Sequence, residues 1–88
     1  MTSRHQLEQL WADVSQLLVE ARQMLPTRPS SHEARACVAQ FDEYLGHNEL
    51  ELAWEALSQA GAVERPPSEF WDLLARAARR MGLKDEAP

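Results

Sequence analysis

Apolar residues recur at spacings of three and four along most of this chain, and Pro or Gly interrupts the pattern at its breaks. This spacing places apolar side chains on one face of an α-helix, which makes one turn in about 3.6 residues. Ala, Leu, Glu, Gln and Arg dominate the composition, and β-branched residues are scarce, which also favours helix. The pattern predicts an all-α fold with helices at about 4–25, 31–45, 49–60 and 69–81.

Polar residues and glycines at the ends of these segments predict the helix caps. Capping-box spacing occurs before the second and third segments. The pairs are Ser30 with Glu33 and Asn48 with Glu51. Ser68 is placed to cap the last helix. A glycine follows each of the last three apolar stripes, where a left-handed C-cap costs least. These glycines are Gly46, Gly61 and Gly82, and Leu83 would close the last cap.

Chain length and loop length together predict the architecture. Eighty-eight residues suffice for one small domain with a continuous core. Only residues 46–48 separate the second and third helices, and so short a connection makes an antiparallel pair. We expect a compact four-helix bundle over residues 1–83, with this short-turn antiparallel hairpin at its centre and a disordered tail at 84–88. The first helix is expected to lie across the hairpin, and the single cysteine, Cys37, to be buried and reduced.

The chain lacks the motifs of the common enzyme classes. It has no Gly-rich phosphate loop and no G-x-S-x-G turn, and its three histidines are too far apart for a zinc site. We therefore expect no catalytic residue, no metal and no cofactor. The first residues lack the apolar core of a secretory signal, and no run approaches the roughly 20 apolar residues of a membrane span. A cytoplasmic protein is expected.

Six acids and no Lys or Arg lie between Ala36 and Glu64. The residues before this window carry four bases and four acids, and those after it carry five bases and four acids. The window thus carries a charge of −6 and accounts for the negative net charge of the chain, which is −5. Concentrated negative charge disfavours nucleic acid, whose phosphates require cations, and suits a basic protein partner.

Helix position explains some of these acids better than others. Glu49 and Glu51 lie in the first turn of a predicted helix, where the helix dipole stabilises negative charge. Asp42 and Glu43 lie in the last turn of the preceding helix, where the dipole disfavours them. Because no Lys or Arg is near in sequence, this pair is a candidate for partner binding. The alternative is neutralisation inside the fold by the basic face of the last helix. The arginines of that face are Arg76, Arg79 and Arg80.

Aromatic residues lie beside the acids at the edges of the apolar stripes. Tyr44 and Trp54 are placed to anchor an interface. Trp11 and Trp71 lie on apolar faces and are expected in the core. His47 is expected in the turn between the second and third helices. The predicted partner-binding surface comprises Asp42, Glu43, Tyr44, His47, Glu51, Trp54 and Glu55.

Residues 41–57 contain a helix that ends at an aromatic–aliphatic pair and a histidine turn, followed by a glutamate that opens the next helix. Residues 70–83 close with a helix that ends in M-G-L. Over about half its length the chain thus resembles small bacterial immunity proteins of the Maf type. The matching positions are Tyr44, Leu45, His47, Glu49, Ala53, Leu57, Met81, Gly82 and Leu83. The resemblance implies an antitoxin that binds and neutralises a cognate polymorphic toxin, often a basic nuclease, by covering it with an acidic surface.

Two other functions fit the same sequence. A helical interaction module of another kind, such as an adaptor or an assembly subunit, would use the same surface. A small regulator associated with nucleic acid would instead use the basic face of the last helix. This face consists of Arg76, Arg79, Arg80 and Lys84. The wide apolar arcs of the last two helices suit either a larger core or a homodimer.

Overall fold

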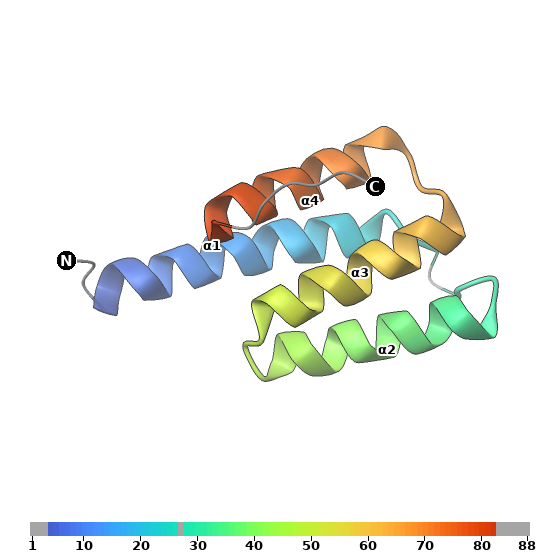
Figure 1. Cartoon of the computed structure of the whole chain (residues 1–88), viewed down its shortest axis with the longest axis horizontal. Coiled ribbons are helices and arrows are strands. Elements are labelled where there is room, and N and C mark those ends of the chain that lie inside the picture. The colour runs from blue at the N-terminus through green and yellow to red at the C-terminus, as the bar shows by residue number, and fades with distance from the viewer. Residues whose placement is uncertain (1–3, 27, 83–88) are drawn as a thin grey trace.

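The computed structural model describes residues 4–26 and 28–82, without the side chains of residues 4, 5 and 7. All regular secondary structure in these residues is helical, and the helices are α1 (Arg4–Gln23), α2 (His32–Gly46), α3 (Leu50–Glu64) and α4 (Ser68–Met81). Each helix runs antiparallel to the one before it (Figure 1). The predicted all-α four-helix bundle is confirmed. The predicted closing residue Leu83 and the predicted tail at 84–88 lie outside the described residues.

Helix α3 is the centre of the bundle, because it contacts α1, α2 and α4. The predicted α2–α3 hairpin is confirmed, and α2 packs almost entirely on α3. Ala53, Ala56 and Ala60 are buried on α3, and such small side chains let neighbouring helices approach closely. Helix α1 pairs with α4 and runs beside α3, rather than across both helices of the hairpin as the sequence suggested (Figure 1).

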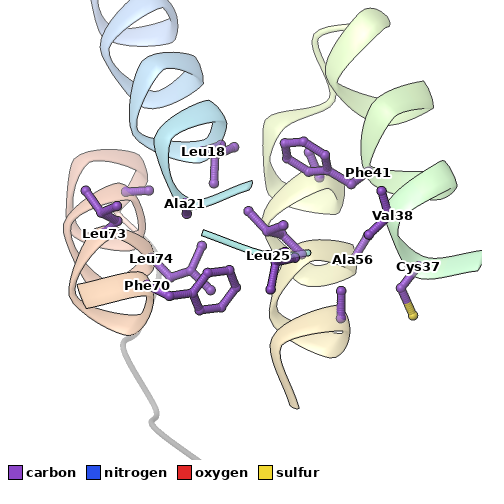
Figure 2. Packing of buried hydrophobic residues seen from close by; sticks show 14 of the residues in the cluster. Leu18, Ala21, Leu25, Cys37, Val38, Phe41, Ala56, Phe70, Leu73 and Leu74 are labelled. Carbon is purple, nitrogen blue, oxygen red and sulfur yellow. The ribbon is translucent and has the colours of Figure 1, made fainter. Parts of the chain in front are cut away.

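The core takes residues from all four helices and from Leu25, which follows α1 (Figure 2). Its largest fully buried side chains are Phe41, Phe70, Leu18, Leu57, Leu74 and Val14. Cys37 is buried at the edge of this core, where its Sγ lies 3.8 Å from Oε1 of Gln59. No polar or charged residue is buried among the described residues, so the core is apolar throughout.

Gly61 does not end α3, so the predicted C-cap at this position is wrong. The helix continues three residues further, to Glu64. Gly61 is buried against α4, and a Cβ atom built on it would lie 2.8 Å from Cζ of Phe70 and closer still to Cε1. The glycine therefore serves the close approach of α3 and α4. Glycine in mid-helix costs about 1 kcal/mol of helix propensity, which the packing of Phe70 offsets.

The α2–α3 turn is closed by a Schellman motif centred on Asn48 rather than by Gly46. Asn48 takes the left-handed conformation with φ 57°. Its N–H donates to the carbonyl of Leu45 at 3.1 Å, and the Glu49 N–H donates to the carbonyl of Tyr44 at 2.8 Å. Asparagine tolerates this conformation better than other side-chain-bearing residues. The predicted left-handed cap at Gly46 is therefore wrong, whereas the one at Gly82, with φ 76°, is confirmed.

The helix beginnings also differ from the predicted capping boxes. Ser31, not Ser30, caps α2, because its Oγ accepts the Ala34 N–H at 3.0 Å. The N-caps of α3 and α4 make no side-chain capping bond. Both predicted boxes and the predicted cap at Ser68 are wrong. Ser30 has a different partner: its N–H and its Oγ each donate to Oε1 of Glu64 at 2.8 Å. Glu64 thus ties the α1–α2 linker to the end of α3.

Arg65 ends α3 in the left-handed conformation, with φ 52°, directly before Pro66. An L-residue with a Cβ atom pays about 1–2 kcal/mol there, and glycine does not. Glycine also loses about 0.4–1 kcal/mol more conformational entropy on folding. We therefore expect Arg65→Gly to raise the free energy of unfolding by about 0.5–1 kcal/mol. Urea denaturation followed by tryptophan fluorescence would measure this gain, and a loss of stability would contradict the left-handed geometry.

Candidate functional site

The two acids of α2 lie in its final turns, immediately before the turn to α3. Phe41, the residue before them, is buried and sets the orientation of the helix, which leaves Asp42 and Glu43 exposed. Neither carboxylate forms an ion pair or a side-chain hydrogen bond with the described part of the chain. Two adjacent negative charges are therefore solvated at this end of the hairpin.

His47 caps α2 through its backbone and leaves the acids uncompensated. Its N–H donates to the carbonyl oxygens of Glu43 and Tyr44, at 3.1 and 3.2 Å. The imidazole is exposed and makes no hydrogen bond to Asp42 or Glu43. The last turn of α2 contains no basic residue. The negative end of the helix dipole thus faces Glu43 in the last turn, at a cost of about 0.3–1 kcal/mol before solvent screening, and Asp42 lies one residue earlier.

Three more acids follow at the start of α3. Glu49 is the N-cap residue and Glu51 lies in the first turn, so both stabilise the positive end of this helix. Glu51 and Glu55 are four residues apart and therefore neighbours on the exposed side of α3, where a like-charge pair costs about 0.2–0.5 kcal/mol. Within the described ranges, all three carboxylates lack an ion-pair partner. We call Asp42, Glu43, Glu49, Glu51 and Glu55 the acidic surface.

The basic face of α4 does not neutralise the acidic surface, so the alternative of an internal match is wrong. Helix α4 packs against α1 and α3 and not against α2. Arg80 forms an ion pair with Asp13 of α1, and both side chains are partly exposed. Arg76 and Arg79 have no carboxylate partner among the described residues. The acids of the α2–α3 hairpin and the arginines of α4 therefore do not pair with each other within the described fold.

The indole N–H of Trp54 forms a hydrogen bond within the fold that the sequence did not indicate. Its Nε1–H donates to the carbonyl oxygen of Leu74 on α4 at 2.8 Å, and its ring packs against the core. A buried indole N–H usually finds such a partner. Trp54 therefore joins α3 to α4, and only the exposed part of its ring is available to a partner.

Tyr44 lies on a different helix–helix contact from Trp54. It is half-buried and packs against the core. Seven residues separate it from Cys37, which places both on one side of α2, and Cys37 contacts Gln59 of α3. Tyr44 thus belongs to the α2–α3 contact, whereas Trp54 belongs to the α3–α4 contact. The two predicted anchors do not form one aromatic cluster.

Trp11 is the aromatic residue that sequence reasoning misplaced. It was expected in the core, but 41% of its surface is exposed. Helix α1 has 20 residues, against 14 for its partner α4, and its first turns project beyond the other helices (Figure 1). An apolar stripe near the start of a long helix can therefore lack a cover. The length difference in the sequence was the available signal. Trp71, in contrast, is half-buried and stacks edge-on against Phe70, with ring centroids 4.9 Å apart.

Open grooves lie near both ends of the bundle in the described residues. One has a volume of about 430 Å³ and lies between the end of α1 and the start of α4. Its lining residues are Glu20, Gln23, Met24, Glu69, Asp72, Leu73 and Arg76. The other has a volume of about 250 Å³ and lies at the opposite end of the bundle, beside Trp11. Its lining residues are Leu10, Trp11, Val14, Asn48, Leu50, Glu51 and Met81.

The described residues offer little for other kinds of site. They contain no group of three His, Cys, Asp or Glu side chains that could hold a metal ion. Nor does any helix among them combine the length and apolar character required to cross a bilayer. Comparison with protein-family models, curated proteins and solved structures found no match to the chain.

Proposed function

We propose that this protein is an immunity protein that binds a cognate bacterial toxin through its acidic surface and thereby neutralises it. The observation that carries the proposal is the set of five exposed acids on the α2–α3 hairpin, none of which is paired within the described fold. The dipole of α3 accounts for Glu49 and Glu51, but no cation among the described residues pairs with Asp42, Glu43 or Glu55. The sequence resemblance of residues 41–83 to Maf-type immunity proteins supports the same function.

The electrostatics favour a basic partner. Nucleases and other enzymes that act on phosphates carry cationic surfaces, and an acidic protein of net charge −5 attracts such surfaces over about a Debye length. Complementary charge accelerates association and orients the two proteins. Tyr44 follows Glu43 and Trp54 precedes Glu55 in the sequence, so their exposed parts would add apolar contact. The bound antitoxin would then cover the toxin's cationic site or a surface next to it.

A rescue experiment tests the proposal. The product of the upstream neighbouring gene would be expressed in a bacterial host with and without this protein. We expect the product to stop growth alone, growth to be restored by co-expression, and the two proteins to co-purify. A neighbouring product that is harmless, or one that stays lethal and does not bind, would refute the immunity function. A stable complex with a harmless product would instead support a helical interaction module of another kind.

Charge reversal tests the surface separately from the function. In the demonstrated complex, Asp42→Lys/Glu43→Lys should raise Kd about 10–100-fold at low salt, because two attractive contacts become repulsive. The difference should shrink as salt rises, since exposed charges are screened. The matched control is Glu20→Lys/Asp72→Lys, which makes the same change of net charge on α1 and α4. Equal effects of both double variants, or no effect of the first, would remove the acidic surface from the proposal.

A further inference from the structure

The groove beside Trp11 combines apolar walls with an unpaired carboxylate. Three helices meet there: α1 contributes Leu10, Trp11 and Val14, α3 contributes Leu50 and Glu51, and α4 contributes Met81. Val14 and Leu50 belong to the buried core, so the floor of the groove is the core itself. Trp11 and Leu52 are the two large apolar side chains that the described fold leaves exposed, each at 41%, and Trp11 lines this groove.

The size of the groove limits what it can hold. Small-molecule and cofactor sites usually occupy about 300–1,000 Å³, whereas this groove has about 250 Å³ and is open to solvent. That space suits one large side chain inserted from outside. Aromatic and aliphatic side chains that fill such pockets provide much of the affinity of protein–protein interfaces.

Negative charge at the rim of the groove determines which kind of partner residue is favoured next to the inserted side chain. Glu51 lines the groove, Glu49 lies two residues before it, and neither has an ion-pair partner in the described ranges. The N-terminus of α3 opposes them with about half a positive charge, so the rim stays negative by more than one charge. Arg80, which directly precedes the lining residue Met81, is paired with Asp13. A cationic residue beside the inserted side chain would therefore be attracted.

We propose that this groove binds a segment of a protein partner in which a leucine- or phenylalanine-sized side chain lies next to a lysine or arginine. Trp11 forms the wall against the apolar side chain, and Glu51 attracts the cation. Because Glu51 also belongs to the acidic surface, the groove extends that surface to the end of the bundle. The inference depends on the proposed function only for the identity of the partner, a basic toxin. The binding chemistry can be tested without it.

The test uses the full chain and three capped dipeptides. The probe is acetyl-Leu-Lys-amide; acetyl-Leu-Glu-amide reverses its charge, and acetyl-Ala-Lys-amide removes its large side chain. In titrations followed by amide and indole NMR signals, the probe should bind with Kd on the order of 1 mM. The shifts should centre on Trp11, Leu50 and Met81. The other two dipeptides should bind at least fivefold more weakly, and equal binding of either one would overturn the proposal.

Matched variants locate the binding site. Trp11→Ala should abolish the shifts and Glu51→Gln should weaken binding about threefold or more, whereas Leu52→Ala and Glu33→Gln should leave Kd unchanged. Circular dichroism would verify that each variant is folded.

The proposal fails if Trp11→Ala binds the probe normally. It also fails if Trp11→Ala abolishes a concentration-dependent dimer, which would make a second copy the occupant. A tenfold gain in affinity on Leu83→Ser would show that the chain's own end fills the groove, and this too would overturn it.

The rescue experiment tests the immunity function and the titration tests the groove, so either hypothesis can be refuted without the other. If Trp11→Ala still protects cells and the probe does not bind, the immunity function stands and the groove is no part of it. If the probe binds as expected and the upstream product is harmless, the groove stands and its partner is a different basic protein.

Discussion

Gly61→Ala is expected to lower the free energy of unfolding by about 1–3 kcal/mol, whereas Gly46→Ala should leave it unchanged or raise it by up to about 1 kcal/mol. Both glycines lie in α-helices, so both substitutions gain helix propensity. A methyl group on Gly46 meets nothing within 4 Å. On Gly61 it would lie 2.8 Å from Cζ of Phe70 and 3.1 Å from Cη2 of Trp71.

The cost at Gly61 follows from how firmly the opposing rings are held. Phe70 is fully buried, and it stacks edge-on against Trp71 at an interplanar angle of 89°. Its ring cannot move aside without disturbing the core, which is packed as densely as a crystal. Urea denaturation of the two variants would measure the contrast. Adding Phe70→Leu to Gly61→Ala should recover part of the stability that Gly61→Ala loses, because the smaller side chain leaves room for the new methyl group and the two residues are in contact. Equal stability of the two alanine variants would contradict the close approach of α3 and α4.

Phe41→Ala is expected to lower the free energy of unfolding by about 3–5 kcal/mol, more than Gly61→Ala. Phe41 is 1% exposed and is one of the largest fully buried side chains in the fold. A domain of this size has a total stability of about 4–13 kcal/mol, so the variant would be marginally folded. Phe41→Leu should lose less than about 1.5 kcal/mol, and Gln40→Ala, an exposed neighbour, should change stability by less than about 0.5 kcal/mol.

The result at Phe41 bears on every binding experiment with the hairpin. Helix α2 packs almost entirely on α3, and Phe41 is one of the buried side chains that hold α2 against the core. A loss at this position would also displace Asp42 and Glu43, which follow it directly. Partner binding should therefore be tested with surface variants that leave Phe41 intact. Urea denaturation gives the stability loss, and a loss below about 1 kcal/mol would show that Phe41 is not packed as described.

The candidate site was only partly predictable from sequence. The exposed positions of Asp42 and Glu43 follow from the apolar stripe of α2, because they fall off the face that Phe41 defines. The hydrogen bonds of Trp54 and Glu64 do not follow from any apolar stripe in the sequence. Their partners, the carbonyl of Leu74 and the hydroxyl of Ser30, lie 20 and 34 residues away along the chain. Long-range hydrogen bonds of this kind depend on how the helices are placed, which local spacing does not specify.

The sequence by itself determined four helices, the α2–α3 hairpin and the concentration of negative charge, because periodicity, short loops and composition act locally. Only the tertiary structure decided that Gly61 packs within α3, that Trp11 is exposed and that no cation among the described residues pairs with the acidic surface. Each of these depends on which helix lies opposite. A glycine ends a helix or admits a neighbour, and a tryptophan is covered or left open, according to the surface that packs against it.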